Sequence, residues 1–338
     1  MKYFFAAFFV LSLVFMISRA SYSQDKNYLI AFSSDASKNN KKQIFIMGSH
    51  GENVKQVCKL NLDCFLPRFS PDGRKIIFTA KNNVSDFLYM IDLDDSSTFS
   101  FPKFIDGGSD PHFSPDGKYL VYQSEKNLDN NVYIMNLETD SSVIASDGSL
   151  SAHAKFSPDG NKIIYSSSAY GNFDLVVLDL FDTTEDAQLT IADTKDAEMY
   201  GTFSPDGKSI AYASFDINYK GTVHICDQDG NNNLSISRGM GSSYDPKFSP
   251  DGTKLAFLSN SGGNIELYIC NADGSNINQL THKNGRTDVF DWSGDSQSLV
   301  YDNIKDEGSS INVININSGK NEDLTGENAV NINPNFQK

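Results

Sequence analysis

The sequence of 338 residues predicts an all-β fold built from seven similar four-stranded sheets. Three observations support this prediction: a motif that recurs at a nearly constant spacing, two short apolar runs inside each repeat, and turn residues between the runs. Repeats of about 40 to 50 residues with four strands each are typical of sheets arranged radially around an axis. The expected architecture is therefore a seven-bladed β-propeller.

The recurring motif is an aromatic residue that is followed in five copies by Ser-Pro-Asp-Gly. The aromatic residues are Phe69, Phe113, Phe156, Phe203, Phe248, Trp292 and Phe336, with spacings of 44, 43, 47, 45, 44 and 44. Because Pro fixes φ near −65° and Gly permits a left-handed φ, Ser-Pro-Asp-Gly suits a tight turn. We therefore interpret the motif as structural and expect its aromatic residue to lie between neighbouring sheets. The copy at Trp292 has the sequence WSGDS, and its turn is expected to be looser.

Each repeat also contains two runs of four or five mainly apolar residues, bounded by Gly, Asn, Asp and Ser. The first runs begin at Leu29, Ile76, Leu120, Ile163, Ile210, Leu255 and Leu299. The second runs are IFIM, LYMI, VYIM, LVVL, VHIC, LYIC and INVI. β-Branched and aromatic residues favour strands, and apolar residues at successive positions indicate strands that are buried on both faces. The runs therefore predict the inner strands of packed sheets.

The two ends of the chain are expected to share one sheet. The first repeat has no FSPDG before its first run, whereas NPNF at Asn333 is similar to DPHF at Asp110 and has no repeat after it. We predict that residues 330–337 supply the innermost strand of the first sheet, so that strand exchange between the N- and C-termini closes seven blades. Six blades with an additional segment are the alternative.

Residues 1–23 have the features of a secretory signal peptide. Lys2 is followed by an apolar run from Tyr3 to Ile17 and then by small and polar residues around Ala20. A run of about 15 residues suits a signal core and is shorter than the roughly 20 that span a bilayer. We expect residues 24–338 to form a single propeller domain that is periplasmic or secreted and is not embedded in a membrane. An uncleaved anchor is the alternative.

Charge and cysteine content narrow the classes of partner and of covalent structure. The net charge of −15 makes nucleic acid an unsuitable partner. Four cysteines are too few for a disulfide scaffold. Cys58 and Cys64 lie close together across a predicted loop and are a candidate disulfide in an oxidising compartment. Cys226 and Cys270 occupy equivalent positions of successive repeats, too far apart to pair, and are expected to be buried thiols.

The repeat resembles that of a known family. The segment FSPDGKYLVYQSEKNLDNNVYIMNLETD is similar to the WD40-like, or PD40, repeat of the TolB-type propellers, and the similarity extends from about Asn27 to the end of the chain. The resemblance implies a propeller that takes part in protein interactions. Because barely four residues separate the predicted cleavage site from the first strand, we expect the separate N-terminal domain of TolB to be absent.

Candidate ligand-binding residues follow from the direction of the innermost strands, which should begin near the channel mouth three residues before each aromatic residue. These positions hold Leu66, Asp110, His153, Tyr200, Asp245, Val289 and Asn333, with Asp288 beside Val289. Their oxygen-bearing side chains suit Ca²⁺ or a polar ligand. A polar, water-filled channel without a specific ligand is the alternative, and no residue is assigned as a metal ligand.

Aromatic residues form a second candidate site, for a partner molecule. Tyr170, Phe173, Phe215 and Tyr219 lie in the long loops of the fourth and fifth repeats, and Tyr200 and Tyr244 lie on the same face. Aromatic side chains gathered in one sector are typical of a surface that binds a peptide or a sugar. Local packing within the propeller is the alternative.

These features predict an exported, monomeric, non-catalytic binding scaffold whose loop face engages a protein or an extracellular polymer. The sequence contains no G-x-S-x-G, H-E-x-x-H or phosphate-binding motif. The alternative is a polysaccharide lyase or hydrolase that acts at the channel mouth. That activity would depend on His153 together with Asp110 and Asp245.

Overall fold

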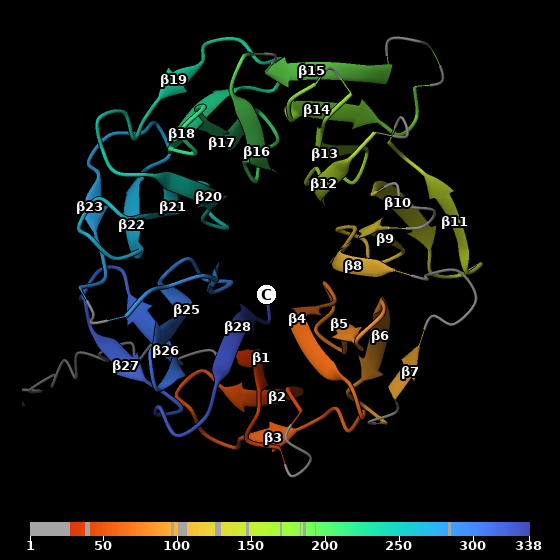
Figure 1. The fold of residues 1–338 in the computed structure, drawn as a ribbon, viewed down its shortest axis with the longest axis vertical. Coiled ribbons are helices and arrows are strands. Elements are labelled where there is room, and N and C mark those ends of the chain that lie inside the picture. Colours follow the sequence, from red (N-terminus) through yellow and green to blue (C-terminus); the bar gives the residue numbers. More distant parts are fainter. Residues whose placement is uncertain are drawn as a thin grey trace, which may run out of the picture.

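The computed structural model of the chain describes residues 28–338 except 38–40, 96–97, 101–106, 126–129, 147–148, 170, 183, 185–186, 193 and 283–284. The predicted signal peptide lies outside the described residues. Seven four-stranded antiparallel sheets surround a common axis (Figure 1). Within the described ranges no helix has the length and hydropathy needed to cross a membrane. The prediction of a seven-bladed β-propeller is confirmed, and the six-bladed alternative is wrong.

We number the blades along the chain and give the strands of each from the channel outward. Blade 1 consists of β28 (Asn331–Phe336), β1 (Leu29–Ser34), β2 (Gln43–Gly48) and β3 (Lys55–Gln56). Blade 2 consists of β4 (Asp63–Phe69), β5 (Lys75–Lys81), β6 (Asp86–Asp92) and β7 (Thr98–Ser100). Blade 3 consists of β8 (Gly108–Phe113), β9 (Tyr119–Ser124), β10 (Asn131–Asn136) and β11 (Ser141–Ile144). Blade 4 consists of β12 (Ser151–Phe156), β13 (Lys162–Ser167), β14 (Asp174–Asp179) and β15 (Gln188–Ala192).

Blade 5 consists of β16 (Ala197–Phe203), β17 (Ser209–Phe215), β18 (Gly221–Asp227) and β19 (Leu234–Ser235). Blade 6 consists of β20 (Ser243–Phe248), β21 (Lys254–Ser259), β22 (Glu266–Asn271) and β23 (Asn278–Gln279). Blade 7 consists of β24 (Phe290–Trp292), β25 (Ser298–Lys305), β26 (Gly308–Asn315) and β27 (Asn321–Asp323).

Hydrophobic clusters between neighbouring blades form the core. In β5, Ile76 and Phe78 belong to the cluster shared with blade 1, whereas Ile77 belongs to the cluster shared with blade 3. The inner strands are thus buried on both faces, as their continuous apolar runs predict. The aromatic residue of the repeat packs against these same clusters, as Phe69 and Phe113 show. The predicted place of the aromatic residue between blades is therefore observed.

The Ser-Pro-Asp-Gly segments form the turns between the innermost and second strands. In blade 3, the Ser114 hydroxyl donates to the Asp116 carboxylate at 2.6 Å, and Gly117 has a φ of 71°. The aspartate of the motif is therefore engaged within its own turn. In the WSGDS copy, Ser296 takes the left-handed φ at 63°, and the hydrogen bond from the turn's serine to Asp295 is kept at 2.7 Å.

The two termini close the ring together. β28 pairs antiparallel with β1, so that Phe336 lies opposite Ile30 and Asn331 lies opposite Ser34. The Phe336 side chain is buried in the cluster between blades 7 and 1. Strand β28 falls within the predicted range 330–337, and closure by strand exchange is confirmed.

Candidate functional site

The residues predicted to line the channel mouth share an unusual backbone conformation. Six of the seven positions have a left-handed φ: Leu66 (51°), Asp110 (47°), His153 (57°), Tyr200 (61°), Asp245 (49°) and Asn333 (55°). Beside each of them the innermost strand shifts its register against the second strand, which marks a β-bulge. Asp, Asn and His tolerate this conformation better than Leu or Tyr. The bulge is thus a feature of the repeat that re-aims one side chain of each innermost strand.

Blade 7 departs from this pattern at Val289, and Asp302 explains the departure. The buried Asp302 carboxylate accepts the backbone N–H groups of Asp288 at 2.9 Å and Val289 at 3.0 Å, and that of Asn333 at 3.3 Å. Burial raises the pKa of Asp302 to about 6, although these three N–H groups oppose the shift. The Asp288 carboxylate instead pairs with Arg286 at 3.1 Å and is 40% exposed. A carboxyl inside the apolar run LVYDN was the sequence signal for Asp302.

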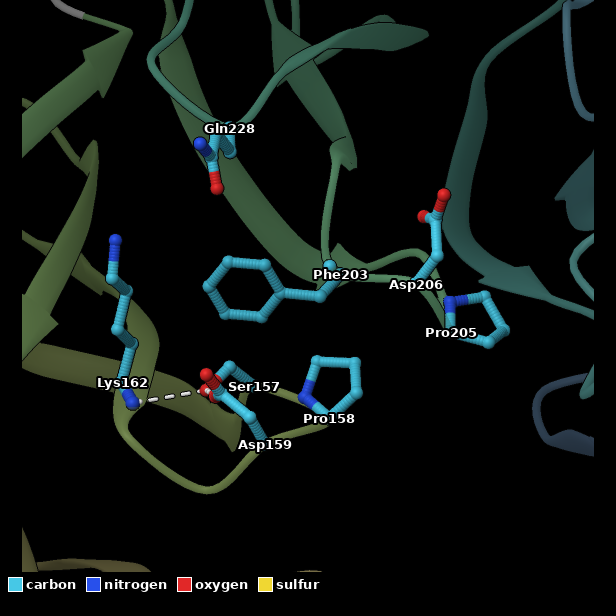
Figure 2. A pocket seen from close by; sticks show the side chains of 9 residues that line it. Ser157, Pro158, Asp159, Lys162, Phe203, Pro205, Asp206 and Gln228 are labelled. Atoms are coloured by element: carbon cyan, nitrogen blue, oxygen red, sulfur yellow. Dashed lines mark hydrogen bonds between the residues drawn. The ribbon is translucent and has the colours of Figure 1, made fainter.

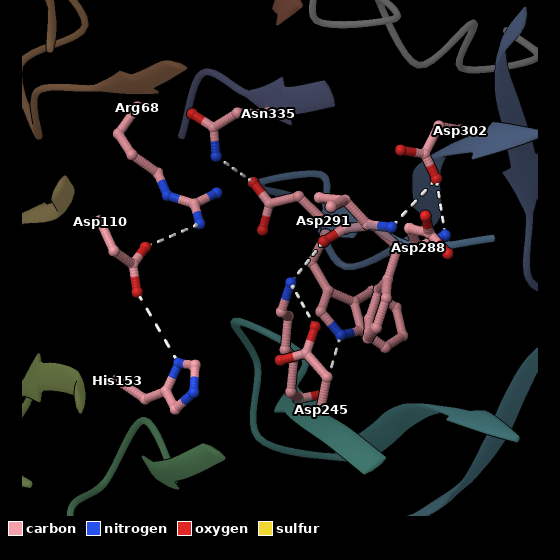
Figure 3. A network of polar contacts seen from close by, with 12 residues as sticks. Arg68, Asp110, His153, Asp245, Asp288, Asp291, Asp302 and Asn335 are labelled. Carbon is pink, nitrogen blue, oxygen red and sulfur yellow. Dashed lines mark hydrogen bonds and ion pairs between the residues drawn. The ribbon is translucent and has the colours of Figure 1, made fainter. Parts of the chain in front are cut away.

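Asp110 of blade 3 connects three blades at the mouth (Figure 3). Its carboxylate lies 3.9 Å from the Arg68 guanidinium of blade 2, 3.4 Å from His112 Nε2 and 3.9 Å from His153 Nδ1 of blade 4. Burial acts to raise the pKa of Asp110, but the His112 hydrogen bond and the charges of His112, Arg68 and His153 outweigh it and hold the pKa well below its usual range. Burial lowers the pKa of both histidines, so their neutral forms dominate at pH 7.

Asp245 of blade 6 forms the second polar group of the mouth. Its carboxylate pairs with the Lys247 ammonium at 3.2 Å. Lys247 also donates to the Phe290 carbonyl at 2.6 Å and lies 4.3 Å from the centroid of that ring. The Trp292 indole donates to the Lys247 carbonyl at 3.0 Å, which ties blade 7 to blade 6. The Asp245 carboxylate is thus already engaged by a cation.

A second ring of polar residues escaped the sequence analysis. It consists of the residue immediately before each blade aromatic: Arg68, His112, Lys155, Thr202, Lys247, Asp291 and Asn335. Asp291 accepts a hydrogen bond from Asn335 Nδ2 at 2.7 Å (Figure 3). The Asp291 carboxylate also lies 3.5 Å from the Lys338 ammonium. The contacts of Asp110 with His112 and of Asp245 with Lys247 join residues of the two rings. The signal was present in the repeat, because four of these residues are basic or His.

The predicted aromatic surface is only partly a cluster. Tyr200 contacts Phe215 and Tyr244, with ring centroids 6.2 Å apart in each case, and its ring lies 4.3 Å from that of His153. Tyr219 is 86% exposed in the turn after β17, and no ring contact is observed for it or for Phe173 among the described residues. Tyr170 lies outside the described residues. The structure therefore brings Tyr200, Phe215 and Tyr244 of the predicted group together and adds His153 to them, whereas Phe173 and Tyr219 make no ring contact with them among the described residues.

The expectation of a Ca²⁺ site finds no ligand set. In the described parts of the chain, no group of three His, Cys, Asp or Glu side chains is arranged to hold a metal ion. The carboxylates of Asp110 and Asp245 are already paired with nitrogen atoms of neighbouring side chains. Ca²⁺ binding therefore stays a prediction.

A pocket on the opposite face is a product of the turns. It lies between blades 4 and 5 and is lined by Phe203, Lys162 and the two Ser-Pro-Asp-Gly turns, as Figure 2 shows. The carboxylates of Asp159 and Asp206 accept hydrogen bonds from the serines of their own turns at 2.6 and 2.7 Å. These acidic groups are occupied by the turn structure.

The cysteines are buried thiols. Cys58 Sγ and Cys64 Sγ lie 3.6 Å apart at the boundary of blades 1 and 2. The structure thus brings the predicted pair together without a covalent bond. Cys226 and Cys270 are buried and unpaired, as expected.

The sequence of this chain matches a known protein family. A family model described as the TolB beta propeller domain matches residues 11–198 and 177–338. The Tol-Pal system protein TolB of Blochmanniella floridana is 35% identical over 101 residues, which are 28% of this chain and 22% of that protein.

Solved structures share the fold at low sequence identity. TolB from Acinetobacter baumannii superposes with a TM-score of 0.61 at 17% identity, covering 92% of this chain and 66% of that chain. Oligogalacturonate lyase in complex with manganese gives a TM-score of 0.64 at 16% identity, covering 88% and 85%. The matches span less than two thirds of the TolB proteins of B. floridana and A. baumannii, and the lyase likeness shows the fold alone. Since the family model matches nearly the whole sequence, this chain belongs to the TolB β-propeller family of PD40 repeats.

Proposed function

We propose that this protein is an exported, non-catalytic binding scaffold whose channel-mouth face binds another protein or an extracellular polymer. The observation that carries the proposal is the convergence of charged and aromatic side chains from separate blades at one end of the channel. His153 contacts both Asp110 and Tyr200, and Tyr200 contacts Tyr244, each across a boundary between blades. Asp245 follows Tyr244 in β20 and pairs with Lys247. A rigid ring of sheets that presents side chains and loops on one face suits recognition.

Membership of the TolB propeller family supports a role in binding. The name of the B. floridana relative places that protein in a Tol-Pal system. The signal peptide predicted for residues 1–23 supports the proposal that the present chain is exported. The partner of this chain is a separate question, because the match covers 22% of that relative.

The geometry gives less support to catalysis at the mouth. His153 lies beside Asp110, but the third member of the expected group, Asp245, is paired with Lys247. The three side chains therefore do not form a continuous chain of hydrogen bonds. Incubation with oligogalacturonate, followed by detection of unsaturated products, tests the lyase alternative. Formation of unsaturated products by the wild type, with loss of this activity in His153→Ala, would contradict the non-catalytic proposal.

Capture of partners from envelope and secreted fractions tests the scaffold proposal. The bait is compared with a variant that carries Phe215→Ala, Tyr219→Ala and Tyr244→Ala on the mouth face. Phe181→Ala is the matched control, because Phe181 is 75% exposed in the turn after β14, on the opposite face. We expect a specific partner that is lost in the triple variant and kept in the control. A partner that the triple variant retains would place binding elsewhere and contradict the proposal.

A further inference from the structure

One basic residue of the channel, Lys155 on β12, lacks the counter-charge that the others have. Arg68 and His112 contact Asp110, and Lys247 pairs with Asp245. In contrast, the structure gives Lys155 no hydrogen bond and no ion pair among the residues that it describes. Lys155 is half-buried, so its ammonium keeps only part of its hydration. Lys155 is therefore a cation of the channel without a counter-charge at ion-pair distance among the described residues.

The charges around Lys155 leave one positive charge in excess. Arg68, Lys155 and Lys247 are cationic, whereas Asp110 and Asp245 supply two negative charges and His112 is mainly neutral at pH 7. The remaining carboxylate of this ring, Asp291, is neutralised by Lys338 at 3.5 Å. This excess of positive charge is confined to the channel, whereas the whole chain has a net charge of −15. One added carboxylate would balance the channel.

A second polar group in the same wall is also unsatisfied. Arg68 Nε is buried and has no hydrogen-bond partner, although the guanidinium reaches Asp110 at 3.9 Å through another nitrogen (Figure 3). Electrostatic interaction connects Lys155 with Asp245, Lys247, Asp110 and Arg68 alike. Cations of blades 2, 4 and 6 thus interact with one another across the channel, unlike a solvated lysine on a flat surface.

Aromatic rings lie next to these charges. The ring of His153, two residues before Lys155 on β12, lies 4.3 Å from that of Tyr200 in a tilted arrangement, and Tyr200 contacts Phe215 and Tyr244. Ring faces of this kind bind the apolar faces of sugars and aryl groups. The two features together define a ligand that has a ring and an anionic substituent.

We propose that the channel mouth is a binding site for a small ring compound that carries one carboxylate. The carboxylate pairs with the Lys155 ammonium, and the ring lies against Tyr200. The shared chemistry fits both a hexuronate and an aryl carboxylate. The site shares Tyr200 with the face proposed above for a macromolecular partner and deepens that proposal. The two tests can fail separately, because the capture experiment changes Phe215, Tyr219 and Tyr244, whereas the ligand titration changes Lys155.

The pH dependence of binding follows from the groups that face Lys155. Burial lowers the pKa of Lys155 to about 8; Asp245 and Asp110 oppose this shift, while Lys247 and Arg68 add to it. A bound carboxylate favours the ammonium form. We therefore expect affinity to be constant near neutral pH and to weaken by about tenfold for each pH unit above the pKa of the free site, as the proton is lost.

Titration calorimetry and NMR titration of the purified protein test the site. The probes are D-galacturonate, its uncharged counterpart D-galactose, and benzoate. The variants are Lys155→Met, which keeps the aliphatic stem, Lys155→Arg, which keeps the charge, and the control Lys162→Met, which changes a lysine of the same blade that lines the opposite pocket. Thermal melts establish that each variant is folded.

We expect at least one carboxylate to bind and D-galactose to bind more weakly. Loss of a charge-assisted contact should weaken binding by about tenfold or more in Lys155→Met, with recovery in Lys155→Arg and no change in Lys162→Met. Preference for galacturonate or benzoate would identify the ring class and support the site. Binding of neither carboxylate, equal binding of D-galactose, or unchanged affinity in Lys155→Met would overturn it.

Discussion

Glu198, at the start of β16, makes the stability of the propeller depend on pH. Its side chain is fully buried, and its Oε1 accepts hydrogen bonds from Thr194 at 2.7 Å and Ser214 at 2.9 Å. Its Oε2 is buried without a hydrogen-bond partner. Burial raises the pKa of Glu198 to about 7, with a smaller contribution from the charges of Asp174 and Asp196.

The direction of the pH effect follows from the raised pKa. Below the unfolded pKa of about 4.5 the folded and unfolded states are both protonated at Glu198, and its favourable contribution is fully present. Between that value and about 7 only the folded state keeps the proton, so the contribution decreases as pH rises and is lost above about 7. Since one pKa unit corresponds to about 1.4 kcal/mol, the loss between low and high pH is about 3 kcal/mol.

The substitution Glu198→Gln isolates this effect, because the amide keeps hydrogen-bonding capacity and does not ionise. We expect the variant to gain up to about 3 kcal/mol in unfolding free energy over the wild type as pH increases from about 4 to about 8. Urea unfolding at both pH values measures the difference. Glu138→Gln, at an exposed position, is the control. A Glu198→Gln difference that is the same at both pH values would refute the reasoning.

Four further predictions concern closure, the thiol pair, the bulge and the buried carboxylate. Deletion of residues 329–338 removes β28 and the buried Phe336, and should lower the melting temperature severely; an unchanged melt would contradict closure by strand exchange. Oxidised glutathione should convert Cys58 and Cys64 to a disulfide by thiol exchange, with loss of two hydrogens by mass spectrometry and a gain of about 2 kcal/mol in unfolding free energy. An oxidised form no more stable than the reduced one would argue against that pairing. Leu66→Asn relieves a left-handed φ of 51° and should stabilise by up to about 1 kcal/mol in urea unfolding, whereas destabilisation would mean that the leucine packing matters more. Asp302→Ala leaves three N–H groups without their acceptor and should cost at least about 2 kcal/mol; a smaller loss would show that water replaces the carboxylate.

The repeat made the fold and one ring of the channel predictable. The constant spacing of the aromatic residues and the apolar runs defined seven blades, and NPNF at Asn333 identified the strand that closes them. The position three residues before each aromatic was predicted to face the mouth, and the structure brings Asp110 and His153 of neighbouring blades into contact at this position. The sequence did not show that this position is a bulge, because the register shift depends on pairing with the second strand.

The pairing of charges was beyond the reach of the sequence. Asp110 contacts side chains of blades 2 and 4, and which side chains meet depends on the angular spacing of blades around the channel. The partners of Asp288 were beyond prediction for a similar reason. Asp302, from the neighbouring strand, binds the Asp288 backbone, and the Asp288 side chain pairs with Arg286.

Hydrogen–deuterium exchange of the protein with and without its captured partner tests most directly the claim that the channel-mouth face is the binding surface. We predict slower exchange in the segments that begin the innermost strands, residues 151–154 and 197–201, and in the loop before β20. Residues 157–161 and 204–208, which form the turns of the opposite face, should exchange at the same rate in both states. Protection confined to those turns would contradict the account.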